Sequence, residues 1–572
     1  MSKHKYLSFE SLYDKYPTNP GKGEAYVGLD AMAETIASNA SNGIVAIELY
    51  PGTSKEVAKE LAGKVASRIK AEIIDVESCA KNNEDIQEMI QPFLTDDRVF
   101  GIMSHFHIED FYDGEKLASL KMGLPSRYVV YGFGASLVTA WNLVYCEISR
   151  WEMQLRFRAH KPNWHAANEM EDPLRKFKRG YFVEWRVADR LKKKILKNAS
   201  FYVDANVDSE WKMIEGKQLF EALHVLSYRP FRLVPYFDPG VWGGQWMKEV
   251  CHLDEKADNF AWSFDGVPEE NALLFDFNGV RVCSPASNLV FFEPKNLLGV
   301  RAYGRFGDEF PIRFDFLDTM DGGNLSLQVH PLTQYAQDTF GIHYTQDESY
   351  YLLDAEPGAV VYLGLKEGVD KEEMIAALKE AQKTGKPFDA DKYVNHFPAH
   401  KHDHFLIPAG TVHCSGKNSM VLEISATPYI FTFKLYDWGR VGLDGLPRPI
   451  HIEHGSKVIQ FDRTTSWVKE NLVCRYEEKE DGWTKTGLHE AEFIETRRKF
   501  FTERTLVKTH GSVNMNNLVE GKAARIVSVD NSFPPYVVHY AETFIIPSTI
   551  EEYYIEPLEE GEKTGVIQAY VR

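Results

Sequence analysis

Apolar runs alternate with amphipathic stretches over roughly the first 225 residues of this chain. Short apolar runs bounded by turn residues predict strands at 44–50, 71–76, 99–103, 128–131 and 201–204. Apolar residues at helical spacing predict helices at 54–70, 183–197 and 210–226, the first capped by Ser54. Strand and helix in alternation favour an open, mainly parallel sheet that is covered on both faces.

Beyond residue 228 the pattern is typical of short strands. Leu325, Leu327 and Val329 alternate with polar residues, and one helical stretch, 370–383, interrupts the strands. Further strand-like runs follow at 498–506, 524–528 and 536–540. The chain is therefore predicted to be a multidomain α+β protein. We expect an α/β domain over 1–227, a β domain with a helical insertion over 228–465, and a smaller β domain over 466–572.

Four polar residues in the strand-rich part are spaced like metal ligands. Gln328 and His330 are two residues apart in a predicted strand, so their side chains share a face. Glu348 opens a later apolar run, and His413 follows a Pro-Ala-Gly turn. Two imidazoles, a carboxylate and an amide oxygen suit zinc or a similar divalent ion with open positions for water or substrate. Each residue taken alone would also fit a structural role, and Cys414, next to His413, is expected to face the other way.

The residues around these four resemble type I mannose-6-phosphate isomerases. The similar motifs, in the order in which that family has them, are Trp242-Gly-Gly, 325–331, 353–365, 407–413, 434–440 and 445–452. The resemblance implies a cupin barrel in which Gln328, His330, Glu348 and His413 bind zinc. It also implies a catalytic role for Arg440 beside the metal. The strand-like runs at 498–506, 524–528 and 536–540 predict a second, smaller cupin-like barrel at the C-terminus. In that smaller domain His510 and His539 lack a carboxylate at ligand spacing, and we expect a structural role for both.

One position departs from the family pattern. The family has a lysine two residues before its glutamate ligand, where this chain has Gln346, and a neutral amide cannot supply that charge. Lys366, Lys417 and Lys434 could each replace it, although each also fits an ordinary solvated lysine.

Isomerising an aldose to a ketose moves a proton between adjacent carbons and needs positive charge at the developing enediolate. Arg440 supplies a permanent charge but is a poor proton carrier. The sequence does not assign the general base, for which the candidates are a metal-bound hydroxide, His343, Glu423 and Asp437. Glu423 alternates with apolar neighbours and is expected to face solvent at least as readily as the site.

Net charge, cysteine spacing and the length of apolar runs limit the kinds of binding partner and cellular location that we expect. The 572 residues carry a formal net charge of -18, which argues against nucleic acid, so a sugar phosphate would need a local basic patch that could include Arg440. The six dispersed cysteines show no disulfide spacing, and we expect a reducing cytoplasm. No apolar run is long enough to span a membrane, and no signal-peptide core is present at the N-terminus.

Two glycine-containing loops in the first domain, 50–55 and 131–136, have the position of phosphate-binding loops but lack the full glycine pattern. The domain vaguely resembles a small-molecule kinase with a degenerate nucleotide loop, and the same glycines also fit ordinary tight turns. We therefore expect a metal-dependent aldose-ketose isomerase that acts on mannose 6-phosphate or a related sugar or sugar phosphate. The alternatives are a non-catalytic sugar sensor that contains the metal, and a bifunctional protein with nucleotide chemistry in its first domain.

Overall fold

The computed structural model of the chain describes residues 5–426, 431–487 and 489–572. It has two compact units, and neither is continuous in sequence. The unit that we call the α/β unit comprises Thr18–Leu226 and Ala272–Phe292, and the unit that we call the β unit comprises Met1–Pro17, Ser227–Asn271 and Glu293–Arg572. The expected domains over 1–227, 228–465 and 466–572 are by contrast continuous segments.

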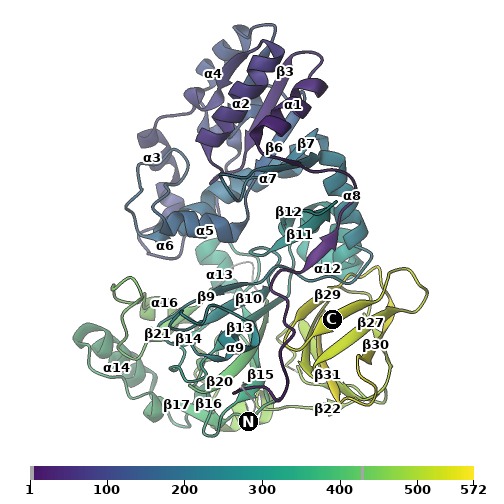
Figure 1. The fold of residues 1–572 in the computed structure, drawn as a ribbon. Coiled ribbons are helices and arrows are strands. Elements are labelled where there is room, and N and C mark those ends of the chain that lie inside the picture. The colour runs from purple at the N-terminus through teal and green to yellow at the C-terminus, as the bar shows by residue number, and fades with distance from the viewer. Residues whose placement is uncertain (1–4, 427–430, 488) are drawn as a thin grey trace. The chain divides into compact units, whose positions relative to one another are not determined.

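The α/β unit is built on a seven-stranded sheet in the order β2-β8-β7-β6-β3-β5-β4. Strands β3, β6 and β7 of this sheet are labelled in Figure 1. Its strands are β2 (Tyr26–Val27), β3 (Ile44–Leu49), β4 (Glu72–Asp75), β5 (Tyr128–Gly132), β6 (Leu143–Glu147), β7 (Phe201–Asp204) and β8 (Lys212–Glu215). The five strands β3 to β7 run parallel, and β8 and β2 add an antiparallel edge. The prediction of a mainly parallel sheet is confirmed.

Helices flank this sheet. They are α1 (Leu29–Asn39), α2 (Lys55–Ile69), α3 (Asn83–Leu94), α4 (Gly114–Met122), α5 (Arg150–Arg158), α6 (Pro173–Arg179), α7 (Trp185–Ile195) and α8 (Gly216–Leu226). Ser54 caps α2 as predicted, because its side chain accepts a hydrogen bond from the Val57 amide. A small sheet of β1 (Thr18–Pro20), β11 (Ala272–Phe277) and β12 (Val280–Pro285), followed by α10 (Ser287–Phe292), completes the unit.

Two element predictions in this unit are wrong. Residues 99–103 form no strand, because Asp97 and Thr95 cap this segment locally and Gly101 packs against Phe182 instead of joining the sheet. The predicted helix over 210–226 starts only at Gly216, since residues 212–215 pair with β7 as β8. Strand β6 was not predicted, although its five residues are all buried.

In the β unit, two antiparallel sheets enclose the candidate metal ligands, and we call this part the first sandwich. One sheet has the order β18-β15-β20-β13-β10-β9 and the other β17-β16-β19-β14-β21. The first sheet consists of β9 (Tyr236–Asp238), β10 (Trp262–Gly266), β13 (Arg313–Asp318), β15 (Asp347–Ala355), β18 (His404–Ile407) and β20 (Ser419–Ala426). The second consists of β14 (Leu327–Val329), β16 (Val360–Leu365), β17 (Val394–Pro398), β19 (His413–Ser415) and β21 (Phe433–Tyr436).

Helices lie between these strands and after β21. They are α9 (Trp246–Val250), α11 (Pro294–Leu298), α12 (Val300–Phe306), α13 (Thr333–Phe340), α14 (Lys371–Thr384), α15 (Ala390–Tyr393), α16 (Ile452–Val458) and α17 (Thr465–Asn471). The predicted helical insertion over 370–383 is confirmed as α14, with Asp370 as its cap. In the Trp-Gly-Gly motif a side chain at Gly244 would meet Asp318 Oδ1 at 2.0 Å, so only glycine fits that approach.

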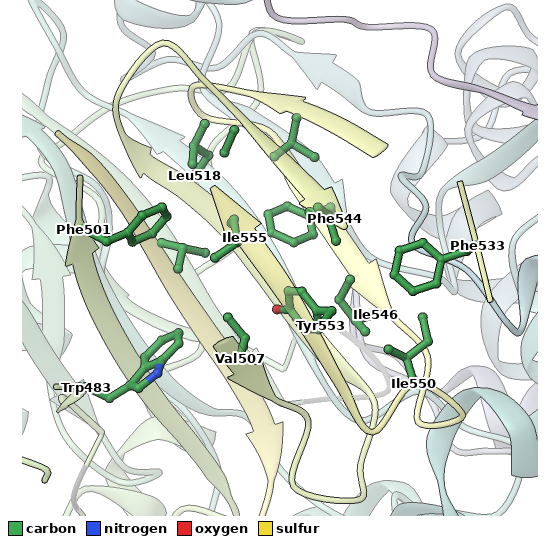
Figure 2. Close-up of a cluster of buried hydrophobic side chains, with 14 residues drawn as sticks. Trp483, Phe501, Val507, Leu518, Phe533, Phe544, Ile546, Ile550, Tyr553 and Ile555 are labelled. Carbon is green, nitrogen blue, oxygen red and sulfur yellow. The ribbon is translucent and has the colours of Figure 1, made fainter. Parts of the chain in front are cut away.

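The C-terminal part of the β unit is a second sandwich with an apolar interior. Its sheets have the orders β22-β23-β24-β31-β26-β29 and β25-β30-β27-β28. The strands are β22 (Glu477–Glu478), β23 (Thr484–Lys485), β24 (Ile494–Phe501), β25 (Thr505–Lys508), β26 (Asn514–Glu520), β27 (Ala523–Ser528), β28 (Tyr536–His539), β29 (Thr543–Ile546), β30 (Glu552–Pro557) and β31 (Thr564–Val571). Figure 2 shows the buried cluster between the sheets, with Phe544, Tyr553 and Ile555 among its members.

None of the helices in the described ranges 5–426, 431–487 and 489–572 has the length and apolar character needed to cross a membrane.

Candidate metal centre

Strands β14 and β19 place Gln328 and His413 side by side. The two residues are direct cross-strand partners, so their side chains share one face of the sheet. The side-chain amide of Gln328 lies 3.2 Å from His413 Nε2. His330, which directly follows β14, is on the same face as Gln328, and its ring centroid is 4.8 Å from that of His413.

Glu348 comes from the facing sheet, near the start of β15. Its Oε2 lies 3.0 Å from His413 Nε2 and is also in close contact with His330 Nε2. The ligand atoms of His330, Glu348 and His413 all lie within 4.8 Å of one another. Among the described residues, no other three side chains of histidine, cysteine, aspartate or glutamate come together closely enough to hold a metal ion. All four candidate ligands are buried. The structure therefore brings together the four residues singled out in the sequence.

Backbone carbonyls fix the orientation of both imidazoles. His330 Nδ1 lies 2.8 Å from the carbonyl oxygen of Phe431, and His413 Nδ1 lies 2.8 Å from that of Thr411. With Nδ1 held by a carbonyl in each ring, Nε2 faces Glu348 and is the ring nitrogen placed to bind a metal. Metal-binding histidines are usually held in this way by a partner on the second ring nitrogen.

The Glu348 carboxyl favours its ionised form. Burial opposes ionisation, but His330 and His413 outweigh it and hold the pKa of Glu348 below its usual range. Its Oε1 is buried and has no hydrogen-bond partner among the described residues. Two imidazole Nε2 atoms, an ionised carboxylate with an unused oxygen and an amide fit a divalent ion such as Zn²⁺.

Glu423 also lies inside the first sandwich, which corrects the expectation that it faces solvent. In β20 it is the direct partner of Asp315 in β13 and of Tyr350 in β15, and its side chain is 7 % exposed. Burial, followed by the charges of Glu348 and Asp315, raises the pKa of Glu423 well above its usual range. The alternation of polar and apolar residues around Glu423 could not predict this burial, because β20 is a central strand that is buried on both faces.

Gln346 is tied to Glu423. Its side-chain amide donates a 3.1 Å hydrogen bond to Glu423 Oε1, and Gln346 is itself buried. The residue that departs from the family pattern therefore contacts the buried carboxyl beside Glu348.

Arg440 lies in a separate charged cluster. Its guanidinium donates to Asp437 and, at 2.6 Å, to the Asn324 carbonyl, while Arg448 binds the other oxygen of Asp437 at 2.6 Å. Ser326 Oγ also donates to Asp437. Burial opposes it, but Arg448 and Arg440 lower the pKa of Asp437, so this carboxylate makes a weak base. No hydrogen bond or ion pair links Arg440 to the four candidate ligands within the described residues.

The remaining candidates differ in position. Lys434 in β21 is the direct partner of Gln328, so its side chain lies on the ligand face of the sheet, and it contributes to lowering the pKa of Asp437. Lys366 donates to the Asp391 carbonyl, and Lys417 is exposed. His343 is exposed. Of the three lysines, the register places Lys434 nearest the ligands.

The two histidines of the second sandwich for which we expect a structural role take part in contacts within that sandwich. His510 stacks on Tyr570 with ring centroids 4.5 Å apart, and His539 Nδ1 lies 3.1 Å from Glu542. In the first sandwich, burial raises the pKa of the Cys414 thiol, which disfavours a thiolate ligand at that position.

Comparison with known proteins separates two parts of the chain. Residues 28–228 match a family model described as a domain of unknown function, DUF8485. The chain is 23 % identical over 332 residues to mannose-6-phosphate isomerase ManA of Bacillus subtilis (strain 168), which covers 58 % of this chain and 97 % of the relative. It is 29 % identical over 234 residues to mannose-6-phosphate isomerase of Streptococcus mutans serotype c, which covers 40 % of this chain and 68 % of the relative.

Solved structures give matches at lower identity. A crystal structure of the mannose 6-phosphate isomerase from Bacillus subtilis has a TM-score of 0.49 at 17 % identity, covering 60 % of this chain and 99 % of that one. A zinc-bound mannose 6-phosphate isomerase has a TM-score of 0.46 at 13 % identity, with the same two coverages.

Proposed function

We propose that this protein is a metal-dependent aldose-ketose isomerase that interconverts mannose 6-phosphate and fructose 6-phosphate or a closely related pair. The convergence of His330, Glu348 and His413, with Gln328 beside them, carries the proposal. The relatives named as mannose-6-phosphate isomerases support the substrate class. We include in the proposal a cupin-like fold for both sandwiches, the division at 1–227, 228–465 and 466–572, and a cytoplasmic location.

The reaction requires a metal, a proton carrier and a cation for the substrate. His330, Glu348, His413 and Gln328 would hold the ion, and a bound divalent ion supplies positive charge to the oxygens of the developing enediolate. Glu423 lies on β20 two residues from Ser425, the cross-strand partner of Glu348, and Gln346 orients it by donating to Oε1. We assign the proton transfer between the two substrate carbons to Glu423.

Lys434, on the ligand face of the sheet, and Arg440, in the charged cluster around Asp437, provide positive charge. Asp437 holds Arg440 and Arg448 together, so two guanidinium groups share one carboxylate and the cluster has a net positive charge. This is the local basic patch that an acidic chain needs in order to attract a sugar phosphate. We assign Arg440 and Lys434 to holding the negative charge of the substrate.

The test is a coupled assay for fructose 6-phosphate formation from mannose 6-phosphate. Protein stripped with a chelator and reloaded with zinc is compared with the Glu348→Ala variant and with Glu356→Ala, which removes a carboxylate just beyond the end of β15. The proposal requires turnover in the reloaded wild type and in Glu356→Ala and its absence in Glu348→Ala. Absence of turnover in zinc-loaded wild type would exclude this substrate pair.

The hydrogen bond between Gln346 and Glu423 also favours a second candidate function, a sugar sensor that contains the metal but does not turn the sugar over. In a sensor the amide at position 346 would occupy the carboxyl that a catalyst needs free. Calorimetry with mannose 6-phosphate on the zinc-loaded chain distinguishes the two functions, because a sensor binds the sugar phosphate while the coupled assay stays silent.

A further inference from the structure

The α/β unit contains a cavity of about 260 Å³ at the carboxyl end of its parallel strands. Its walls come from the segment after β3, from the residues that follow β4 and β5, and from α5 and the segment after it. The residues that matter here are Lys55, Glu77, Phe133, Arg156, Trp164 and His165.

The position of this cavity follows from the strand order. The chain leaves β3 toward β5 and β4 on one side, and β6 and β7 lie on the other side of β3. The direction of winding therefore reverses at β3, and the loops that leave the sheet on either side separate there. In open parallel sheets this crevice is where ligands bind.

A carboxylate, an ammonium group and an imidazole meet in the cavity wall. Glu77, 7 % exposed, accepts a hydrogen bond from the Phe133 amide through Oε1 and one from Lys55 Nζ, at 2.7 Å, through Oε2. His165 Nε2 lies 3.6 Å from the same Oε2. The backbone of His165 is left-handed at φ 43°, a sparsely populated conformation for a residue other than glycine.

An aromatic surface adjoins these groups. The Trp164 ring packs edge-to-face on Phe133 with centroids 5.3 Å apart, and it lies 4.5 Å from the His165 ring. Two lining residues also have buried polar atoms with no hydrogen-bond partner among the described residues, namely Thr53 Oγ1 and Trp164 Nε1. A wall that combines an apolar ring with carboxylate and imidazole groups suits a ligand with both C–H faces and hydroxyl groups.

The loop after β3 does not suit a nucleoside triphosphate. A side chain on Gly52 would lie 2.9 Å from Met153 Cγ, and Arg156 donates to the Gly52 carbonyl at 3.1 Å, so the loop is closely packed from that side. Glu56 accepts a hydrogen bond from Ser54 at the start of α2 and places a carboxylate where phosphate would need positive charge. The cavity is also slightly below the range of about 300–1,000 Å³ that is usual for drug-sized ligands.

We propose that this cavity is a second ligand site, for a small hydroxyl compound the size of a monosaccharide. Hydroxyl groups of the ligand bind the Glu77 carboxylate and the His165 imidazole, and its C–H face lies on Trp164. The choice of mannose and mannose 6-phosphate as probes rests on the proposed function, whereas the site itself rests on the geometry of the α/β unit.

Isothermal titration calorimetry on the full chain tests the proposal. The chain carries Glu348→Ala, so that the candidate metal centre is disabled, and is titrated with mannose, with mannose 6-phosphate and with ATP. We expect one equivalent of mannose or of mannose 6-phosphate to bind. If mannose suffices, the hydroxyl groups account for recognition; if only mannose 6-phosphate binds, the phosphate contributes as well.

Variants in the same background locate the site. His165→Asn removes the imidazole while keeping a residue that tolerates a left-handed backbone, and it should weaken binding at least tenfold. Glu77→Gln should do the same while keeping the acceptor for Phe133, and Glu34→Gln, an exposed carboxylate on α1, should change nothing. Circular dichroism confirms that each variant is folded, and His165→Asn decides the matter if Glu77→Gln unfolds.

Three results would overturn the proposal: no binding of either sugar, sugar binding that His165→Asn leaves unchanged, or binding of ATP alone. The coupled assay on the chain with Glu348 intact is measured separately. Failure of turnover there bears on the proposed function and leaves the outcome for this site untouched.

Discussion

His404 allows a quantitative prediction about stability in acid. The residue lies on β18, directly opposite Tyr351, and is fully buried. Neither of its ring nitrogens has a hydrogen-bond partner among the described residues. Burial, helped by the positive charge of Arg498, lowers the pKa of His404 from 6.5 to about 3. The native protein therefore keeps this imidazole neutral at pH values where the unfolded chain protonates it.

Proton linkage gives the sign and size of the change in the free energy of unfolding with pH. Below pH 6.5 the unfolded state binds a proton that the native state does not, so the free energy of unfolding falls as the pH falls, and the loss continues down to about pH 3. Each pH unit in this window costs about 1.4 kcal/mol, so His404 alone removes about 2 kcal/mol between neutral pH and pH 5. The neighbouring Tyr351, His402 and Arg498 are present in both wild type and a variant that lacks His404, so their contributions to the pH dependence cancel when the two proteins are compared.

Urea unfolding of wild type and His404→Leu at pH 7.5 and pH 5, followed by tryptophan fluorescence, measures this difference. Leucine needs no hydrogen-bond partner, so the variant should be as stable as wild type or more stable at pH 7.5. At pH 5 its advantage should grow by about 2 kcal/mol. His400→Leu, at a side chain that is 76 % exposed, is the matched control and should show no such growth. Equal pH dependence in wild type and His404→Leu would refute the reasoning.

Three further predictions concern the candidate centre and the fold around it. Glu423→Gln should lower kcat about 10²- to 10⁴-fold while zinc content, measured by atomic absorption, stays at one per chain; a normal kcat would remove Glu423 from the mechanism. Lys434→Ala should raise the KM for mannose 6-phosphate at least about tenfold, whereas Lys417→Ala should leave it unchanged, and equal effects would contradict the register argument. Ile555→Ala, in the core of the second sandwich, should cost about 2–5 kcal/mol in urea unfolding without loss of bound zinc; loss of zinc instead would contradict a purely structural role for that core.

The candidate metal ligands were predictable because strand geometry is local. A period of two puts Gln328 and His330 on one face, and the polar residues at that spacing stand out against apolar neighbours. That the carboxylate comes from the opposite sheet is a long-range fact. In the sequence Glu348 stands out only as a polar residue that opens an apolar run, and the resemblance to known isomerases groups it with the other three. Whether these residues hold a metal and perform catalysis stays a prediction.

The partners of these residues could not be predicted, because they depend on which strands become neighbours. Glu423 alternates like a half-exposed strand residue, yet β20 lies between β13 and β15 and is covered on both faces. The Asp437 contacts with Arg440 and Arg448 join a strand end to a loop eleven residues away, and no periodicity encodes that approach. In the α/β unit, β8 was missed because its pairing with β7 overrides the helical pattern that follows it.

The most direct test of the central claim is a zinc titration of the stripped protein with turnover of mannose 6-phosphate as the readout. The account predicts that turnover rises in proportion to bound zinc and saturates at one ion per chain, and that the variant Glu348→Ala gains neither. Turnover that persists in the stripped protein, or a chain that holds one zinc ion and converts no sugar phosphate, would contradict it.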